Sequence, residues 1–198
     1  MNRPHPIFQF RYPLILASES PRREQILRML GFDFSVAPSG VEETVPPDLK
    51  PEQVTETLAR AKALPVSRER KEALVIGADT LVMLDNRILG KPSNPGEALE
   101  MLRFLSGRTH LVYTGVALAR EGTVIGSGVE CSEVTFAAWG DAELKAYIQS
   151  GEPMDKAGAY AIQGRGAFLV EGIRGCFFNV MGLPVQMTLR LLSQFRAT

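Results

Sequence analysis

The segment SESPRR places two arginines in the first turn of a predicted helix. Ser20 is a favourable N-cap residue, and Pro21 suits the first helical position. Because the helix dipole is positive at this end, Arg22 and Arg23 are locally unfavourable there. If this end faces an anion, the free N–H groups, the Ser18 and Ser20 hydroxyls and the guanidinium groups can all donate to it. The segment therefore indicates a phosphate site, against the alternative of two solvated arginines.

A single aspartate follows a run of apolar residues that is typical of a strand covered on both faces. The run is ALVIGAD, which ends in Asp79, and Gly77 within it permits close approach of another backbone. We expect the strand to end here, where open α/β sheets gather their ligands. A carboxylate at this point is suited to bind a metal ion or act as a base. The alternatives are that Asp79 caps a turn and that Thr80 is only a strand-forming residue.

Two lysines and one glycine-rich stretch supply further polar candidates. Lys62 lies in LARAKA, whose alanines leave its flanks uncluttered, and Lys91 lies in the turn LGKP. Asp155 and Lys156 begin the stretch DKAGAYAIQGRG, which contains Gln163 and suits a loop folded over a ligand. The alternatives are solvated surface lysines and a turn with a surface ion pair, which stabilises little.

Helix and strand patterns alternate along the chain, with both parallel-type and hairpin signals, so we predict one α/β folding unit. The predicted helices start at N-cap or proline signals and cover Ser20 to Gly31, Pro51 to Leu64, Asn94 to Gly107 (where Asn94 and Glu97 form a capping box), Asp141 to Ser150, and Leu183 to Phe195. The predicted strands are YPLILAS, ALVIGAD, an antiparallel pair HLVYTGVALA and TVIGSGVECSEVTFAAW around Glu121-Gly122, and short strands in Ala159 to Met181.

Composition excludes several classes of protein. The chain has 22 lysines and arginines against 22 aspartates and glutamates, so a general affinity for nucleic acid or an anionic membrane is not expected. Cys131, Cys176 and the two histidines, His5 and His110, show no zinc, disulfide or nucleophile spacing. Charges and prolines occupy the opening residues, and no later stretch could span a bilayer, so we expect a cytoplasmic protein.

Seven motifs in order resemble those of Maf-type nucleotide pyrophosphatases: LASESPRR, LARAKA, VIGADT, LGKP, LSGRTH, EPMDKAGAYAIQGRG and NVMGLP. The resemblance covers nearly the whole chain after about Tyr12. It implies an α/β fold similar to that of inosine-triphosphatase-like enzymes, with a curved mixed sheet, flanking helices, two lobes and a central cleft. We expect a short extension at 1–12 and a single such domain at 13–198.

The resemblance also implies site residues. Asp79 matches the family's proton acceptor, and Glu43 is a second carboxylate near metal and water; whether Glu42 or Glu43 points inward is open. The other matched positions bind substrate: Ser18, Arg23, Lys62, Lys91, Asp155 and Lys156. The expected reaction cleaves a nucleoside triphosphate between the α- and β-phosphates, with Mg²⁺ or Mn²⁺ held by Asp79 and Glu43.

One branch of the family resembles dTTP/UTP pyrophosphatases, and its selectivity positions correspond to Arg22, Thr80 and Gln163. The Gln163 amide can accept from the N3–H of uracil or thymine while donating to a neighbouring carbonyl. Ala161 stands where this branch usually has glycine, so a left-handed backbone at Ala161 would be strained.

Three other interpretations stay open. The chain could belong to the 7-methyl-GTP branch, although AYAIQG and Thr80 favour the pyrimidine branch. It could also be a nucleotide-binding regulator of cell division without turnover. Against this, a pure binder gains nothing from acidic groups such as Asp79 and Glu43 beside a polyanion unless a metal lies between them. The natural target could be a normal or a modified pyrimidine nucleotide, the latter in a house-cleaning role, and a homodimer is left open.

Overall fold

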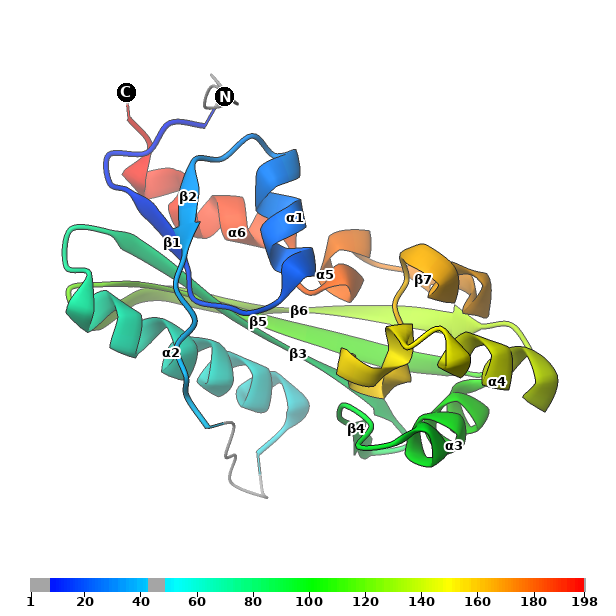
Figure 1. Ribbon diagram of the computed structural model, residues 1–198. Helices are drawn as coiled ribbons and strands as arrows, with labels where there is room; N and C mark the ends of the chain where they lie inside the picture. Colours follow the sequence, from blue (N-terminus) through cyan, green and yellow to red (C-terminus); the bar gives the residue numbers. More distant parts are fainter. Residues whose placement is uncertain (1–7, 43–48, 198) are drawn as a thin grey trace. The chain divides into compact units, whose positions relative to one another are not determined.

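The computed structural model describes residues 8–42 and 49–197, which form a mixed α/β structure (Figure 1). Within these residues one seven-stranded sheet has the order β2-β1-β3-β5-β6-β7, with β4 paired to β3. Strand β1 pairs in parallel with β2 and β3, whereas the β3–β4 and β6–β7 pairs are antiparallel. The strands are β1 (Leu14–Leu16), β2 (Phe34–Val36), β3 (Leu74–Leu84), β4 (Arg87–Leu89), β5 (Thr109–Arg120), β6 (Thr123–Phe136) and β7 (Val170–Arg174).

The chain divides into two compact units. Unit 1 comprises residues 1–79, 114–130 and 182–198, and unit 2 comprises residues 80–113 and 131–181. Unit 1 contains helices α1 (Pro21–Met29), α2 (Pro51–Glu69) and α6 (Val185–Leu192) and the short 3-10 helix η4 (Ser193–Phe195). Unit 2 contains α3 (Pro95–Leu105), α4 (Asp141–Gln149) and α5 (Phe177–Met181), with the 3-10 helices η1 (Glu152–Asp155), η2 (Ala157–Ala159) and η3 (Gly164–Leu169). No helix in the described part of the chain is long and apolar enough to cross a membrane.

Two glycines let α2 lie directly on the sheet of unit 1. A Cβ built on Gly77 of β3 would lie 2.2 Å from the Ala59 carbonyl oxygen and 2.9 Å from the Ala63 Cβ. A Cβ on Gly115 of β5 would lie 2.4 Å from the backbone of Thr55. The buried cluster under the helix is correspondingly made of small side chains, namely Ile15, Ala17, Ala59, Ala63, Val66, Ala73, Val75, Ala117 and Ala119. Helix and sheet therefore meet backbone to backbone rather than through large side chains.

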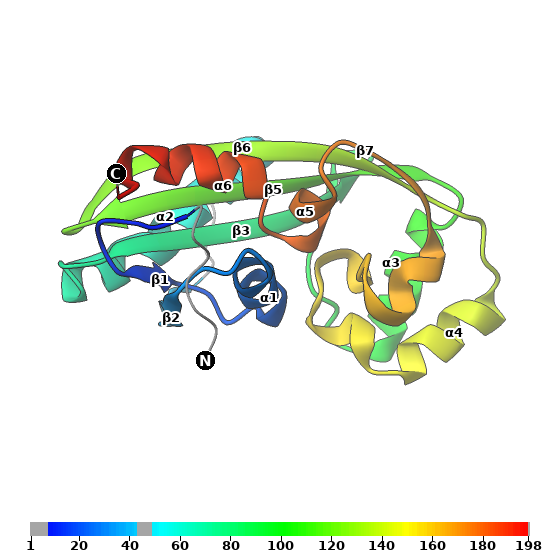
Figure 2. The ribbon, with the colours of Figure 1, turned by 90° about the horizontal axis from the view of Figure 1, so that it is seen from above.

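The opposite face of the sheet in unit 1 is covered by α1 and α6, as both ribbon views show (Figures 1 and 2). Side chains along β6 follow the alternation of a strand. Gly126 and Gly128 face α6, where a Cβ would meet Leu191 and Met187, whereas the Ser127 hydroxyl between them donates to Glu56 of α2 at 2.6 Å. The strand thus contacts a helix on each face, as a sheet covered on both sides requires.

The core of unit 2 packs α3 and α4 with the 3-10 helices around a buried aromatic group. Phe136 and Tyr160 lie edge to face with centroids 4.7 Å apart, and His110 Nε2 lies 2.8 Å from the Tyr160 hydroxyl. Burial lowers the pKa of His110 to about 4, so the ring is neutral near pH 7. His110 is a core residue, which agrees with the absence of a nucleophile or metal-ligand motif around it in the sequence.

Most predicted helix boundaries are confirmed, and capping contacts fix two of them, the end of α1 and the start of α3. Helix α1 ends in a left-handed Gly31 (φ 71°), with the Phe32 N–H donating to the Leu27 carbonyl, as in a Schellman motif. Ser20 occupies the N-cap position of α1, but its side chain makes no cap hydrogen bond. At α3 the Asn94 side chain accepts from the Glu97 N–H at 3.0 Å, while the Glu97 carboxylate accepts from Ser93 instead of completing the box at Asn94.

Three predicted elements are wrong in extent or type. Helix α2 continues through Pro65 to Glu69, because Val66 and Ser67 beyond the proline are buried within unit 1. Strand β3 continues past Asp79 to Leu84, so this aspartate lies within the strand rather than at its end. Residues 159–181 hold one strand, β7, and otherwise form η3 and α5. Left-handed backbone at Ala159 and Gly164 interrupts extended structure there.

The hairpin β5–β6 is confirmed. Its turn has positive φ at both Glu121 (54°) and Gly122 (77°), the geometry that matches the twist of two antiparallel strands. The predicted mixed sheet with flanking helices is confirmed as well. The central cleft and the single domain over residues 13–198 stay predictions.

Replacing Gly77 by alanine tests the close contact between α2 and the sheet. The added Cβ would meet backbone atoms of Ala59 and Ala63 that cannot rotate away, so helix and strand must separate. We expect Gly77→Ala to lower the free energy of unfolding by about 1–3 kcal/mol, measured by urea denaturation. The matched control is Gly172→Ala on β7, where a Cβ meets nothing within 4 Å. Equal stability of the two variants would contradict the packing described for α2.

Candidate active site

In unit 1 the first helix carries a buried arginine whose guanidinium group is held by protein acceptors. Arg23 Nε donates to the Gly182 carbonyl at 2.8 Å, and its Nη1 donates to the Ser18 hydroxyl at 3.0 Å. The same hydroxyl accepts from the Ser20 N–H at 3.2 Å. Ser18 and Arg23 are both more than nine-tenths buried. The structure therefore brings together two predicted site residues and adds the Gly182 carbonyl, which carries no signal in the sequence because any residue has one.

A second pair in unit 1 consists of the predicted catalytic aspartate and a lysine from α2. Lys62 Nζ lies 2.6 Å from Asp79 Oδ1, with both side chains only about a tenth exposed. Gly77 and Asp79 are two residues apart and so lie on the same face of β3, the face that α2 contacts. Because Gly77 admits the α2 backbone near Ala63, the neighbouring Lys62 can reach the carboxylate.

The two pairs lie at the same level along two neighbouring strands of the sheet. Strand β1 is in parallel register with β3, with Leu16 opposite Ile76, and the Ala17 N–H donates to the Ile76 carbonyl at 2.8 Å. Ser18 therefore leaves β1 where the neighbouring strand reaches Ala78 and Asp79. Ser18 thus follows the carboxyl end of β1, whereas β3 runs on past Asp79.

The other unit 1 candidates are less defined. Arg22 lies on α1 and is partly exposed. Glu43 lies outside the described residues, and Glu42 is exposed, so which of the two faces the substrate stays open. In the described residues no group of three or more histidine, cysteine, aspartate or glutamate side chains could hold a metal ion. The donor chemistry of Asp79 still fits Mg²⁺ or Mn²⁺, because these ions commonly take one or two carboxylates together with water and phosphate oxygens.

In unit 2 Lys156 is a buried cation. Its Nζ donates to the Glu152 carbonyl at 2.6 Å and to Asp155 Oδ1 at 2.6 Å. The Lys156 side chain is 10% exposed, whereas that of Asp155 is 64% exposed. The ion pair therefore differs from the surface pair considered as an alternative, because its lysine is enclosed by protein.

The turn that carries Lys91 is joined to the segment that carries Lys156. The Gly158 N–H donates to the Gly90 carbonyl at 3.0 Å, next to the exposed Lys91. A Cβ on Gly158 would meet Val82 at 3.1 Å, so this glycine also packs on β3. By alternation, the predicted selectivity residue Thr80 lies on the same strand face as Val82. These unit 2 candidates therefore share one region of the fold.

Gln163 is half-buried in the segment between η2 and η3. The strain expected at Ala161 is wrong: Ala161 has no positive φ, and its N–H donates to the Tyr147 hydroxyl at 3.2 Å. The left-handed alanine is Ala159, with φ 58°. A methyl group at position 161 is accommodated because the backbone there is not left-handed.

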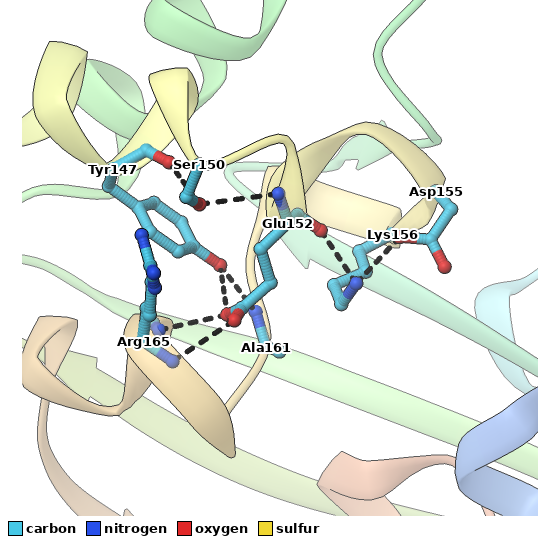
Figure 3. Close-up of polar contacts among 8 residues, drawn as sticks. Tyr147, Ser150, Glu152, Asp155, Lys156, Ala161 and Arg165 are labelled. Carbon is cyan, nitrogen blue, oxygen red and sulfur yellow. Dashed lines mark hydrogen bonds and ion pairs between the residues drawn. The ribbon is translucent and has the colours of Figure 1, made fainter.

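Sequence reasoning missed Glu152, which organises this segment (Figure 3). Its Oε1 accepts from the Tyr147 hydroxyl and the Gly166 N–H, each at 2.9 Å, and its Oε2 accepts from the Arg165 N–H at 3.0 Å. Partial burial raises the pKa of Glu152. These hydrogen bonds and the nearby charge of Lys156 together lower the pKa by more than burial raises it, so the pKa of Glu152 is below its usual value. Glu152 stands in the EPMDK motif, yet two of its partners are backbone groups, which the sequence does not reveal.

Comparison with known proteins gives consistent relatives. The chain is 49% identical over 187 residues to a dTTP/UTP pyrophosphatase of Moorella thermoacetica, covering 92% of this chain and 94% of that protein. It is 48% identical over 183 residues to a dTTP/UTP pyrophosphatase of Bacillus cereus, covering 92% and 89%. A protein of the same description from Bacillus anthracis is 47% identical, covering 92% and 95%.

Among solved structures, a nucleoside-triphosphatase (dITP/XTP pyrophosphatase) of Mycobacterium abscessus matches 90% of this chain and 92% of its own at 13% identity and a TM-score of 0.37. This likeness is too weak to support an inference about the fold or the function. The family assignment rests on sequence, since the model of the Maf-like proteins matches residues 13–195. With that match and with relatives nearly half identical over nine-tenths of its length, this chain belongs to the Maf family.

Proposed function

We propose that this chain hydrolyses nucleoside triphosphates at the α–β phosphate bond, with dTTP and UTP preferred, to give a nucleoside monophosphate and pyrophosphate. The observation that carries the proposal is the buried ion pair of Asp79 with Lys62, at the same level of the sheet as the Ser18–Arg23 pair in unit 1. A buried carboxylate among cations and a hydroxyl is the combination that phosphoryl transfer to water needs. The relatives described as dTTP/UTP pyrophosphatases support the reaction and the substrate class.

Asp79 is the proposed base. Lys62 holds Oδ1, which fixes the carboxylate rotamer, and we assign Oδ2 to the attacking water. A carboxylate fixed in this way removes a proton as the water attacks the α-phosphorus and needs no covalent intermediate. Asp79, with Glu43 from outside the described residues, would hold Mg²⁺ or Mn²⁺, which when bound offsets charge on the phosphate oxygens.

Cationic side chains stabilise charge in this proposal. Arg23 orients the Ser18 hydroxyl and contributes fixed positive charge, because its Nε and Nη1 already donate to protein oxygens. Lys62, Lys91 and Lys156 bind phosphate oxygens, and Asp155 orients Lys156 through their ion pair. Such preorganised charges need not rearrange as the leaving pyrophosphate gains charge.

Selectivity is assigned to Gln163, Thr80 and Arg22. A pocket that hydrogen-bonds the base edge rejects other bases by leaving buried polar groups unpaired. The 7-methyl-GTP alternative is disfavoured by the relatives, which are described as acting on dTTP and UTP. A binder without turnover is disfavoured by Asp79, since a buried carboxylate weakens the binding of a polyanion unless it takes part in chemistry or metal binding.

The proposal also covers the location, partners and domain organisation that the sequence led us to expect. It includes a cytoplasmic location, no nucleic-acid or membrane partner and a single domain over residues 13–198, while a homodimer and a house-cleaning role toward modified pyrimidine nucleotides stay open. The balanced charge of 22 basic and 22 acidic residues supports the expectation that the chain has no general affinity for nucleic acid or an anionic membrane.

Product analysis tests the bond that is cleaved. With dTTP and Mg²⁺ or Mn²⁺ we expect dTMP and pyrophosphate in equal amounts, resolved by anion-exchange chromatography. Reaction in ¹⁸O-labelled water should place the label in dTMP, because the proposed attack is on the α-phosphorus. Formation of dTDP and orthophosphate would contradict the mechanism.

Replacing Asp79 by asparagine tests the base. The amide keeps the size of the side chain but loses basicity, so we expect Asp79→Asn to lower kcat by about 10²–10⁴-fold while dTTP binding, measured by calorimetry, persists. The control is Asp85→Asn, which removes an exposed carboxylate at the β3–β4 turn. Near-native turnover of the Asp79 variant would remove this residue from the chemistry.

Replacing Gln163 by leucine tests selectivity. The loss of base-edge hydrogen bonds should cost about 1–3 kcal/mol of transition-state binding for dTTP and UTP, that is about 5- to 150-fold in kcat/KM. Purine triphosphates should lose much less, since phosphate binding is unchanged. Gln149→Leu, at the exposed end of α4, serves as the control. Equal losses on every substrate would assign Gln163 to loop structure instead.

A further inference from the structure

The segment from Ala161 to Gly166 is fixed at both ends by one pair of side chains (Figure 3). At its start, the Ala161 N–H donates to the Tyr147 hydroxyl at 3.2 Å. At its end, the Arg165 and Gly166 N–H groups donate to the two carboxylate oxygens of Glu152. The pair is itself closed by the Tyr147 hydroxyl, which donates to Glu152 at 2.9 Å. We refer to Tyr147 and Glu152 with these three N–H groups as the clamp.

The backbone of the segment is shaped to fit around the Glu152 carboxylate. Gly164 has φ 72°, and a Cβ there would lie 2.7 Å from Glu152 Oε2. A Cβ on Gly166 would lie 2.5 Å from both the Tyr147 hydroxyl and the Ala161 carbonyl oxygen. The two glycines that punctuate AIQGRG therefore allow close contact with the clamp. Gln163 lies midway between the two anchored ends.

Glu152 also holds the neighbouring cation through its backbone, since its carbonyl accepts from Lys156 Nζ at 2.6 Å. The Ser150 hydroxyl completes the support, donating to the Tyr147 carbonyl at 2.6 Å and accepting from the Glu152 N–H at 3.3 Å. A single residue thus holds the backbone that follows Gln163 and the position of a buried lysine. Its side chain and its carbonyl serve these two functions separately.

The fold of this region does not depend on the clamp alone. Tyr160 and Leu169, which flank the clamped segment on either side, are buried in the apolar core of unit 2. The ring of Tyr147 belongs to the same core. Removing only the Tyr147 hydroxyl therefore leaves the apolar anchors intact and removes the hydrogen bonds to Ala161 and Glu152, so the apolar and polar contributions can be separated by experiment.

We propose that Tyr147 and Glu152 are positioning residues for base selectivity, which hold Gln163 in the orientation that recognises the pyrimidine edge. The inference rests on the proposed function and adds residues to it that touch no substrate. A selective hydrogen bond needs its donor and acceptor fixed to within a few tenths of an ångström, and side chains locked by a second layer of hydrogen bonds supply that precision.

The kinetic test uses Tyr147→Phe and Glu152→Gln. Phenylalanine keeps the ring but loses both hydrogen bonds of the hydroxyl, and glutamine presents an amide donor where the carboxylate accepts from N–H groups. We expect kcat/KM for dTTP and UTP to fall by about 10-fold, mostly through KM, while the value for GTP changes by no more than about two-fold. The control variants, Tyr12→Phe and Glu143→Gln, should keep the native ratio of kcat/KM for dTTP to kcat/KM for GTP.

A double-mutant cycle asks whether the clamp acts through Gln163. If it does, adding Tyr147→Phe to Gln163→Leu should not further lower the ratio of kcat/KM for dTTP to kcat/KM for GTP. The reason is that the contact that the clamp positions is already absent in the Gln163 variant. Additive losses of selectivity would overturn the inference. So would equal losses on all substrates for the single variants, which would make the clamp a stability device.

Hydrogen exchange gives a readout that does not require turnover. In both clamp variants the amides of 161–166 should exchange faster than in the native protein, while amides of the β5–β6 hairpin keep their protection. Unchanged exchange in 161–166 would overturn the inference. If the native protein failed to release pyrophosphate from dTTP, the proposed function would fall, and the exchange experiment would still report separately on the clamp.

Discussion

The close approach of α2 to the sheet is the constraint on which the candidate site depends. A helix normally stands off a sheet by the length of its side chains, but Gly77 and Gly115 remove that spacing where α2 crosses β3 and β5. Because the helix lies so close, Lys62 Nζ can approach Asp79 Oδ1 to 2.6 Å, in a region that is nearly closed to water. In that setting the charge of the lysine offsets the cost of burying the carboxylate. A larger residue at position 77 would therefore disturb packing and electrostatics together.

Two carboxylates, the buried Asp79 and the half-buried Glu152, are satisfied in different ways, and the difference separates their functions. The described partner of Asp79 is one side-chain ammonium group, so water, metal or phosphate can still be accommodated around the carboxylate without breaking the fold. Glu152 accepts from two backbone N–H groups and a phenol, which depend on its staying in place. A carboxylate bound to backbone donors is an architectural element, whereas one bound to a flexible side chain can take part in a reaction.

The sequence predicted what depends on local pattern and missed what depends on backbone geometry. Gly31 and Asn94 gave correct helix ends, because C′ glycines and N-cap side chains act within a few residues. Pro65 was misleading, since burial of Val66 outweighs the local preference of proline to end a helix. The strand through Asp79 ran longer than expected because the pairing with Lys62, distant in sequence, makes a buried aspartate tolerable in mid-strand. Glu152 was missed because N–H partners leave no mark in the residue types.

Arg23 illustrates how one sequence signal can combine two causes. Two arginines at a helix N-terminus were explained by a phosphate nearby, yet Arg23 is buried and donates to Ser18 and to the Gly182 carbonyl. These neutral oxygens already make a cation in the first helical turn acceptable, so its presence alone does not require an anion. Its neighbour Arg22 is partly exposed, so its guanidinium group is accessible to solvent or to a ligand. The phosphate interpretation thus depends on Arg22 and on the Ser18 hydroxyl, which Arg23 orients, more than on Arg23 itself.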